Sequence, residues 1–312
     1  MTNRIDSELF EFFSAQLSIW DNAKNNYKDL DNVETKDIGD LKVQFNPARI
    51  ISSTAKIDKT SIEKRPCFLC KKNRPKEQIS KPFTTDYEIL VNPFPILPIH
   101  FTIPNIQHKA QSILESYPTI HKLLVQYNNI VVFYNGGLCG ASAPDHLHFQ
   151  AGLTGLLPIQ INWNRLYENS KIIKDFHNNE KILTLSKYPF PNIVIQSSNN
   201  EYDYKLFKIV YNALPLLENN LEPMLNIVAW KEEEKFITII FPRIKHRPKC
   251  YFANGKDAIM ISPGALDMAG LIILPRKEDY DNINKEKLLT NVLEVTPNSR
   301  TMKTIIDNIK RI

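Results

Sequence analysis

Apolar residues recur along the chain with two periods, one helical and one strand-like. Helical spacing is found in residues 9–20, 108–129 and 206–217, and again from Lys285 onward. Pro118 lies inside the second of these segments, so we expect a break or a new helix to begin there. Short strands are predicted at residues 41–45, 50–57, 88–91, 100–103, 130–134, 145–151, 193–196, 225–231, 236–241 and 271–274. This mixture predicts an α+β protein.

The order of these elements indicates that the second half of the chain repeats the inventory of the first. We expect an N-terminal half over residues 1–160 that holds the catalytic motif. A connection over 161–204, with a helix near 163–176, is expected to lead to a C-terminal half over 205–312. Residues 21–40 are polar and are expected to be a connection too. One continuous domain is the alternative to two similar α+β units.

The composition is that of a soluble globular protein, with 43% hydrophobic and 23% charged residues among 312. The net charge of +5 suits anionic substrates such as nucleotides, but a solvated lysine-rich surface explains it equally well. No apolar run reaches membrane-spanning length, and four cysteines are too few for a disulfide framework. We therefore expect a cytoplasmic protein without a membrane partner. The basic residues lack interleaved aromatic residues, which argues against a nucleic-acid partner.

The sharpest chemical pattern is His146-Leu147-His148-Phe149-Gln150, which lies in a predicted strand. Alternate side chains of a strand share a face, so both histidines and the glutamine are expected to point the same way. The leucine and phenylalanine between them then enter the core. A lone histidine here would be a satisfied core residue, because buried polar groups need partners. Three polar groups at this spacing indicate a functional site.

A glycine-rich turn, Asn135-Gly136-Gly137-Leu138-Cys139-Gly140, precedes this strand. Its glycines permit backbone conformations in which N–H groups face an anion, and Ser142 can add a hydroxyl group. Phosphate is the anion that such a turn suits best. An imidazole held beside a phosphate is a plausible nucleophile at phosphorus.

A second motif, Cys67-Phe68-Leu69-Cys70, has the spacing with which two thiolates bind one tetrahedral ion. Alone it supplies half of a zinc site. Strand pairing could bring His108 or His146 close enough to complete a Cys₂His₂ site. The alternative is a reduced pair of thiols that binds no metal.

These residues resemble the landmarks of a known family. The segments Arg65-Pro66, Cys67–Cys70 with Asn73, and Val91–Leu97 are similar to those of galactose-1-phosphate uridylyltransferases. Asn46-Pro47, Asn135 and Gly137 also resemble that family's motifs. The form His-Leu-His-Phe-Gln looks more like the GDP-hexose phosphorylases, a sister group that also includes the diadenosine tetraphosphate phosphorylases. Residues 242–248 and 262–265 resemble the C-terminal half of that branch, and the resemblance covers about residues 41–275.

The resemblance implies a duplicated histidine-triad fold with a central antiparallel sheet flanked by helices. It also implies that His148 attacks the α-phosphorus of a nucleoside diphosphate sugar or a dinucleotide. Inorganic phosphate or a sugar phosphate would then take the nucleotidyl group from the histidine. In this scheme Gln150 binds the phosphoryl oxygens, and a structural zinc ion is held by Cys67, Cys70, His108 and His146. The family places Ser-x-Pro directly before the first histidine, whereas here Asp145 intervenes.

Further residues are candidates for contacting the substrate. Polar and turn residues are Asn92, Asn135, Gly137, Gly140 and Ser142. Basic residues that could balance phosphoryl charge are Arg49, Lys245 and Arg247, together with Arg243 and Lys64. Each of these basic side chains could equally be a solvated surface residue.

The leading hypothesis is a nucleotidyltransferase of the phosphorylase type, acting on a nucleotide sugar or a dinucleotide. A hexose-1-phosphate uridylyltransferase is the alternative within the same chemistry, and water in place of the acceptor would give a hydrolase. From another class, a zinc-stabilised nucleotide-binding protein without turnover is a further alternative. The sequence leaves open the base, the sugar, the acceptor and whether the protein is a monomer or a dimer.

Overall fold

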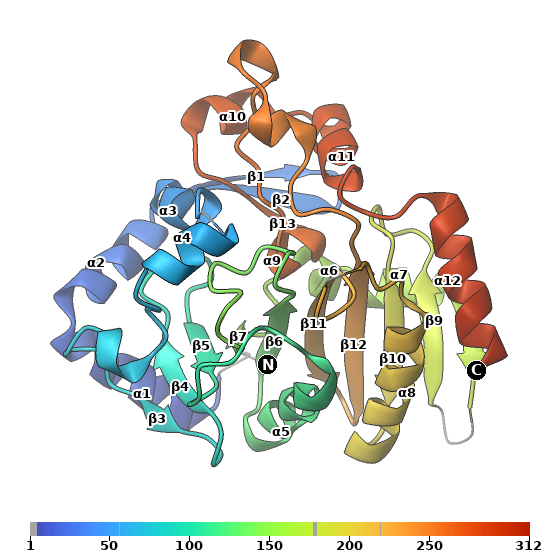
Figure 1. Cartoon of the computed structure of the whole chain (residues 1–312), viewed down its shortest axis with the longest axis horizontal. Helices are drawn as coiled ribbons and strands as arrows, with labels where there is room; N and C mark the ends of the chain where they lie inside the picture. Colours follow the sequence, from blue (N-terminus) through green and yellow to red (C-terminus); the bar gives the residue numbers. More distant parts are fainter. Residues whose placement is uncertain (1–4, 56, 177–179, 219) are drawn as a thin grey trace.

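The computed structural model describes residues 5–55, 57–176, 180–218 and 220–312. A ten-stranded sheet crosses the molecule in the order β3-β4-β5-β7-β6-β11-β12-β10-β9-β8, and its neighbouring strands all pair antiparallel (Figure 1). The strands of the first half are β3 (Lys81–Pro82), β4 (Glu88–Val91), β5 (His100–Pro104), β6 (Ile130–Asn135) and β7 (His148–Leu153). Those of the second half are β8 (Ser170–Asp175), β9 (Lys181–Leu185), β10 (Ile193–Ser197), β11 (Leu225–Glu232) and β12 (Lys235–Pro242).

The two halves of the chain meet at the pair β6–β11, where Tyr134 lies opposite Ile227. One sheet therefore runs through both halves without a break. The fold class predicted from the sequence, a central antiparallel sheet flanked by helices, is confirmed.

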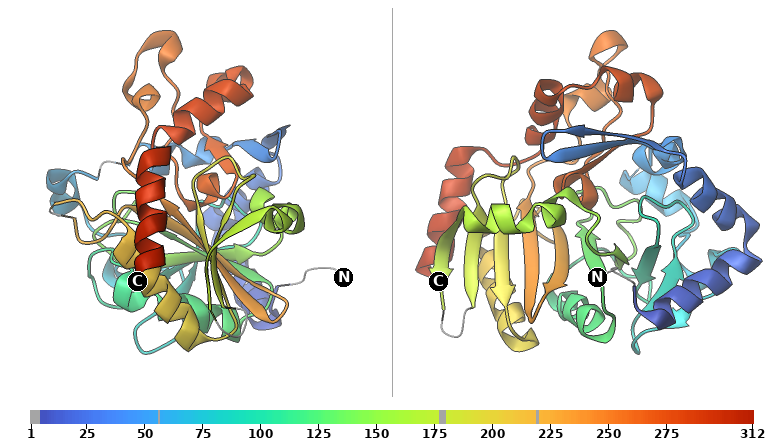
Figure 2. Two further views of the ribbon diagram at one scale, coloured as in Figure 1. Left: turned by 90° about the vertical axis from the view of Figure 1, so that its right-hand side faces the viewer. Right: turned by 180° about the vertical axis from the view of Figure 1, so that it is seen from behind.

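Each face of the sheet has its own hydrophobic core. Along β6, Val132 and Tyr134 pack into one core while Val131 and Phe133 pack into the other, as the two-residue period of a strand requires. The first core is covered by α1 (Ser7–Ile19), α2 (Asp21–Leu30), α5 (Pro118–Gln126), α8 (Asn200–Ala213) and α12 (Ser299–Arg311). The second is covered by α6 (Pro158–Ile161), α7 (Trp163–Glu168), α9 (Ala265–Met268), α10 (Lys277–Asn282) and α11 (Lys285–Leu293). The side view in Figure 2 shows α8 and α12 on one side of the sheet and α6 and α7 on the other.

A small second sheet joins a segment of the N-terminal half to a segment of the C-terminal half. It has the order β1 (Glu34–Ile38), β2 (Leu41–Phe45) and β13 (Leu271–Leu274), and β13 runs parallel to β2. Figures 1 and 2 show the β1–β2 hairpin lying beside α10 and α11, which follow β13. Among the described residues, no helix has both the length and the apolar character needed to cross a membrane.

Many predicted elements are found at their expected positions. Strands β2, β4 and β13 have the predicted bounds, and α5 begins at Pro118. Pro118 stands at the first helical position, where its missing N–H group costs nothing. The C-terminal helical stretch from Lys285 forms α11 and α12.

Four segments differ from expectation. The strand expected at 50–57 is instead α3 (Ile50–Ser53), with α4 (Lys59–Lys64) beyond it, and Ile50 and Ile51 are largely exposed. Residue 56 lies outside the described residues. The expected connection 21–40 holds α2 and β1, because Ala23, Tyr27 and Leu30 bury one helical face.

The segment 161–204 forms α7 and adds the strands β8–β10 to the main sheet. We had expected this segment to be a connection with a single strand at 193–196. The expected helix near 163–176 ends at Glu168. Strand β8 is the outermost strand and has exposed positions on both faces, so its sequence shows no clear alternation.

Strand β7 begins at His148, whereas the predicted strand began at Asp145. The preceding residues form a turn closed by a hydrogen bond from the His146 N–H to the Ala143 carbonyl oxygen, 3.1 Å long. His146 therefore does not share a strand face with His148 and Gln150. This turn separates the two histidines into different environments.

Candidate active site

A cavity of about 600 Å³ opens over the ends of β5, β6 and β7. His148, Gln150 and Asn135 line it together with Gly140, Ser142, Asn92 and Arg49, all candidates named from the sequence. The N-terminal half supplies most of the wall, and the loop from Ser262 to Asp267 supplies the remainder from the C-terminal half. Most of the residues expected to contact substrate thus gather around one space.

The tautomer of His148 follows from its hydrogen bonds. Its Nδ1 lies 2.8 Å from the carbonyl oxygen of His146, and a carbonyl oxygen can only accept, so Nδ1 carries the proton. The Nε2 lone pair is left available, and Nε2 has no hydrogen-bond partner among the described residues. The side chain is 5% exposed. Burial is the main cause that lowers the pKa of His148 to about 4, so the imidazole is neutral near pH 7.

Gln111 fixes the backbone on which His148 stands. Its Nε2 donates to the carbonyl oxygens of Asn135 and His148, at 2.9 and 3.1 Å, and its Oε1 accepts from the His148 N–H at 2.9 Å. The side chain thereby bridges β6 and β7 beyond their last paired residues, Phe133 and Gln150. Gln111 was not predicted from the sequence, because its partners are backbone atoms of distant strands.

The orientation of Gln150 is set by His100, a residue that sequence reasoning missed. Nδ1 of His100 accepts from the Ile96 N–H at 3.2 Å, so its Nε2 bears the proton and donates to Gln150 Oε1 at 2.9 Å. With its oxygen occupied, the Gln150 amide has its N–H groups left for a ligand in the cavity. Burial, reinforced by the charge of Arg49, lowers the pKa of His100 to about 3 and keeps it neutral. A lone histidine in an apolar strand was the only signal.

The glycine turn packs tightly against the C-terminal half. A Cβ atom on Gly136 would lie 2.8 Å from the Leu225 carbonyl oxygen, and one on Gly140 would lie 2.9 Å from Gly264 Cα. Gly140 also has φ +94°, which side chains disfavour. The N–H of Gly137 donates to Glu222 Oε1 at 3.3 Å, so this group is directed at a protein carboxylate, although we expected it to face a phosphate.

Glu222 is a third residue that sequence reasoning missed. It is 6% exposed and accepts from the Tyr134 hydroxyl, from the Gly137 N–H and, at 2.9 Å, from the Ile113 N–H. Burial is the largest influence on this carboxyl and raises its pKa to about 7, against the opposing effect of these donors. Glu222 holds the glycine turn from the second half of the chain.

The basic candidates fall into two groups. Arg49 lines the cavity, where its Nη1 donates to the Phe94 carbonyl oxygen at 2.8 Å and leaves further N–H donors. Lys245 pairs with Glu294 at 2.6 Å, and neither Lys245 nor Lys64 belongs to the lining. Arg247 also lies outside the lining. It donates to Ser262 Oγ at 2.9 Å and to the carbonyl oxygens of Ser53 and Ala55, so it ties two segments of the cavity rim together.

The four predicted metal ligands are brought together. One ligand atom from each of Cys67, Cys70, His108 and His146 lies within 4.8 Å of the others. His146 Nδ1 lies 3.3 Å from Cys67 Sγ, and His108 Nδ1 lies 3.2 Å from Cys70 Sγ. This agrees with the turn before β7, which directs His146 toward the cysteines and leaves His148 facing the cavity.

The far nitrogen of each histidine in this cluster faces an oxygen atom. His146 Nε2 lies 2.7 Å from the Asn105 carbonyl oxygen, and His108 Nε2 lies 3.5 Å from Asp145 Oδ2. Metal-ligating histidines commonly have such partners, which fix the ring and the tautomer. Asp145 also pairs with Arg65 at 2.8 Å, and Arg65 lines the cavity.

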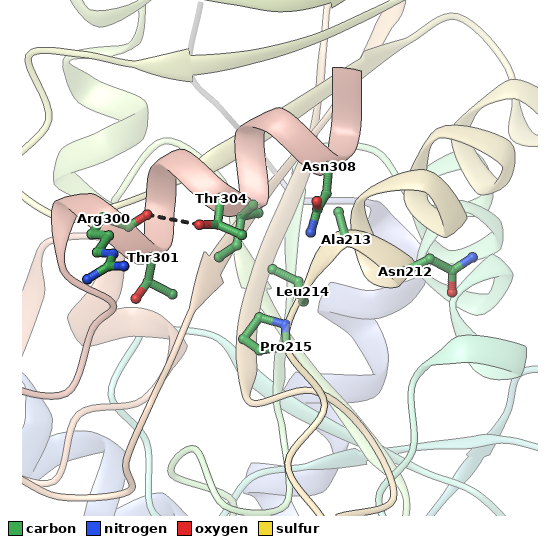
Figure 3. Close-up of a pocket in the computed structure, with 9 residues that line it drawn as sticks. Asn212, Ala213, Leu214, Pro215, Arg300, Thr301, Thr304 and Asn308 are labelled. Atoms are coloured by element: carbon green, nitrogen blue, oxygen red, sulfur yellow. Dashed lines mark hydrogen bonds between the residues drawn. The ribbon is translucent and has the colours of Figure 1, made fainter. Parts of the chain in front are cut away.

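A second hollow, of about 360 Å³, lies between the end of α8 and α12 (Figure 3). Its lining includes Asn212, Leu214, Arg300, Thr304 and Asn308. The Thr304 hydroxyl there donates to the Arg300 carbonyl oxygen at 3.2 Å. None of the sequence candidates lines this hollow, whereas the larger cavity is lined by seven of them.

Two family models match the chain, one in each half. Residues 12–153 match a domain of unknown function (DUF4922), and residues 165–312 match the GDPGP1-like C-terminal domain. GDP-L-galactose phosphorylase 2 of Arabidopsis thaliana is 27% identical over 163 residues, which cover 49% of this chain and 33% of that protein. This match spans about a third of the length of the plant relative.

Among solved structures, yeast Ap4A phosphorylase Apa2 in complex with Ap4A is similar, with a TM-score of 0.60 and 18% identity. The match covers 94% of this chain and 98% of that chain. The same enzyme in complex with AMP gives a TM-score of 0.56 over 89% and 97% of the two chains. At this identity the likeness shows a shared fold.

The C-terminal half of the chain thus matches the GDPGP1-like C-terminal domain, and the chain is similar to a GDP-L-galactose phosphorylase in sequence and to an Ap4A phosphorylase in fold. The resemblance inferred from the motifs is thereby confirmed. The pattern expected from the resemblance has Ser-x-Pro directly before the first histidine, and Asp145 is an extra residue at this point. The structure shows which residues Asp145 contacts. It lies between His108 of the cysteine cluster and Arg65 of the cavity wall, while Ser142 still lines the cavity.

Proposed function

We propose that this protein is a nucleotidyltransferase of the phosphorylase type that forms a covalent intermediate on His148. The observation that carries the proposal is the bond from His148 Nδ1 to the His146 carbonyl oxygen, which leaves the Nε2 lone pair for a ligand in the cavity. This lone pair lines the cavity wall together with Gln150 and Asn135, which distinguishes His148 from His121, a buried histidine outside the cavity. A binding protein without turnover would have no need of this arrangement.

The transfer has two displacements at phosphorus. First, Nε2 of His148 forms a bond to the α-phosphorus while the bond from that phosphorus to its bridging oxygen breaks, and this oxygen leaves on the sugar phosphate or nucleotide. Next, an oxygen of inorganic phosphate bonds to the phosphorus, and the phosphorus–nitrogen bond breaks with its electron pair returning to Nε2. The proton on Nδ1 stays there throughout, in its hydrogen bond to the His146 carbonyl oxygen.

The cavity wall supplies stabilisation for the phosphoryl charge. The Gln150 amide N–H groups and the guanidinium of Arg49 face the space beside His148. Fixed donors of this kind act most strongly where water is largely excluded, and His148 is 5% exposed. Asn92, Ser142 and Asn135 add further polar groups to the same wall.

The relatives support the substrate class. One is named as a phosphorylase of GDP-L-galactose and the other as a phosphorylase of Ap4A, and both names describe transfer to phosphate. We therefore infer that the donor is a nucleotide sugar or dinucleotide and that inorganic phosphate is the acceptor. The described cysteines are all free thiols, which suits the cytoplasmic location expected from the sequence.

We also propose that Cys67, Cys70, His108 and His146 hold a zinc ion. Two thiols and two imidazoles with their ligand atoms within 4.8 Å form the donor set that tetrahedral zinc prefers, and the outer nitrogens of both histidines face oxygen atoms. The ion would supply a structural crosslink. These residues would then tie the segment after Arg65 to the turn that precedes His148.

Labelling tests the covalent intermediate. The protein is incubated in turn with GDP-, UDP- and ADP-sugars and with Ap4A, each labelled at the α-phosphate. We expect at least one donor to leave an acid-labile adduct on the protein. His148→Ala should abolish the adduct. His121→Gln should retain it, because His121 packs on Phe236 outside the cavity. No adduct with any donor would contradict the proposal, and adding phosphate or hexose 1-phosphate to the labelled protein identifies the acceptor.

Elemental measurement tests the metal. We expect about one zinc ion per chain, because a Cys₂His₂ set fills the tetrahedral coordination of one ion. Cys67→Ser should lower the zinc content and the thermal midpoint, since metal binding adds to folding free energy. Cys250→Ser, a buried thiol outside the cluster, should keep the zinc. A purified protein without stoichiometric zinc, whose thermal midpoint no chelator alters, would show that the cysteines are ordinary thiols.

A further inference from the structure

A buried chain of polar groups leads from the C-terminal half to the cavity. Arg243 Nη1 donates to Asn226 Oδ1 at 2.5 Å, and Asn226 Nδ2 donates to Asn135 Oδ1 at 2.8 Å. Arg243 is 2% exposed and Asn226 0% exposed. Of the three residues only Asn135 lines the cavity. Arg243 and Asn226 therefore lie behind the cavity wall, and Asn135 is the side chain that joins them to the cavity.

The guanidinium fixes the direction of every amide in this chain. A guanidinium only donates, so the atom of Asn226 that faces Arg243 is its oxygen, and its nitrogen must face Asn135. That nitrogen only donates, so it meets the oxygen of Asn135. The Ala265 N–H donates to the same oxygen at 2.7 Å. The Asn135 amide consequently has its N–H groups left for the cavity.

Apart from Asn226, the partners of Arg243 are main-chain oxygens. Besides Asn226 it donates to the carbonyl oxygens of Pro263, Lys245, His246 and Val295, at 2.8 to 3.4 Å. Its guanidinium therefore has little freedom to turn. Arg243 was a candidate for balancing phosphoryl charge, but it lies behind the cavity wall.

We propose that Arg243 and Asn226 are positioning residues that lock the Asn135 amide with its N–H groups toward the transferred phosphoryl group. Asn226 Nδ2 also donates to the Cys139 carbonyl oxygen at 2.6 Å, so the same lock holds the glycine turn. The inference rests on the proposed function for the identity of the phosphoryl ligand. Asn135 and Gln150 are then a matched pair, two amides whose oxygens are occupied by protein donors and whose nitrogens face the reaction.

The test is Asn226→Asp, which keeps the size of the side chain and its bond to Arg243. The second carboxylate oxygen would now meet Asn135 Oδ1, and the Asn135 amide should rotate so that its oxygen faces the cavity. We expect the rate of His148 labelling to fall about 100-fold, the range found when one donor to a transition-state oxyanion is removed. Asn192→Asp is the matched control, because Asn192 is 2% exposed and bonds within the β9–β10 turn. Its labelling rate should be unchanged.

A double-mutant cycle separates positioning from general damage. In Asn135→Ala the amide is absent, so adding Asn226→Asp should cause a much smaller further loss of labelling rate, limited to the effect of losing the bond to the Cys139 carbonyl oxygen. Equal losses in both backgrounds would overturn the proposal, because Asn226 would then act independently of Asn135. Thermal midpoints of all variants show whether they fold.

Binding distinguishes this inference from the proposed function. The affinity of each variant for AMP and GMP, measured by calorimetry, needs no turnover. If the wild type forms no adduct, the proposed function fails. The lock is still supported if Asn226→Asp lowers nucleotide affinity in the wild-type background but has no such effect when added to Asn135→Ala. Unchanged nucleotide affinity and unchanged labelling in Asn226→Asp would overturn the lock alone.

Discussion

At the scale of single residues, the site depends on which polar atoms the fold leaves unsatisfied. His148 donates a hydrogen bond from Nδ1 to a backbone carbonyl oxygen, and Gln150 Oε1 accepts a hydrogen bond from His100. The residue types were predictable from the sequence, because two histidines and a glutamine at this spacing suit phosphoryl chemistry. Their orientations were not, since they are fixed by His100 and by the backbone of Ile96, far away along the chain.

Two substitutions at His100 separate its two hydrogen bonds. Asparagine places an oxygen near the position of Nδ1 and should keep the bond from the Ile96 N–H, while losing the donor to Gln150. We expect His100→Asn to slow His148 labelling about 10- to 100-fold, because the Gln150 amide can then turn away from the reacting phosphate. Single-turnover labelling measures this rate.

Glutamine is the matched variant at the same position. Its amide nitrogen lies near the position of Nε2, so His100→Gln should keep the donor to Gln150 and leave the Ile96 N–H unpaired. We expect lower stability with a labelling rate close to that of the wild type. If the two variants lose rate to the same extent, His100 supports the core and does not orient Gln150.

At the scale of elements, periodicity predicted most of the strands, although not β8 and β9, and it missed the effects of the turns. Strand β4 lies between two neighbours and has its predicted bounds, because its apolar run is buried throughout. The turn before β7 is different: one hydrogen bond from His146 to Ala143 takes His146 out of the strand. Strict alternation would have placed it beside His148, and the turn places it beside Cys67.

The short helix α3 is a second example of local chemistry that periodicity does not detect. Ile50 and Ile51 are β-branched and suggested a strand, yet Pro47 begins a helical turn that runs on into α3. Arg247 donates hydrogen bonds to two carbonyl oxygens of this region, those of Ser53 and Ala55. The contact joins residues almost two hundred positions apart, so the sequence alone offered no sign of it.

At the scale of the whole molecule, the two halves form one sheet and one site. The pairing of β6 with β11 brings Asn226 beside Asn135, and the same junction brings Glu222 to the glycine turn. Sequence patterns predicted two similar halves, but neither half shows which of its strands lies at the junction. The C-terminal half therefore supports the catalytic turn from behind, with contacts that only the assembled sheet creates.

The assembled fold also buries an acid whose titration affects global stability. Asp203, in the first turn of α8, is 2% exposed and accepts from the Ser197 hydroxyl at 2.8 Å. Burial raises its pKa to about 7, and the nearby charge of Glu180 adds to the rise, while the hydroxyl groups of Ser197 and Tyr117 oppose it. In an unfolded chain an aspartate titrates near 3.9.

The sign of the resulting pH dependence follows from these two values. Because the folded-state pKa is raised, the stability contributed by protonated Asp203 is complete below about pH 4 and is lost as the pH rises through about 7. Asp203→Asn cannot ionise. We therefore expect the free energy of unfolding of the wild type to fall relative to this variant from pH 5 to pH 7, by up to about 1.4 kcal/mol per pH unit. Other titrating groups are common to both proteins and cancel in the difference. Denaturant unfolding at several pH values measures it, and parallel stability curves for the two proteins would show that Asp203 is already ionised in the folded state.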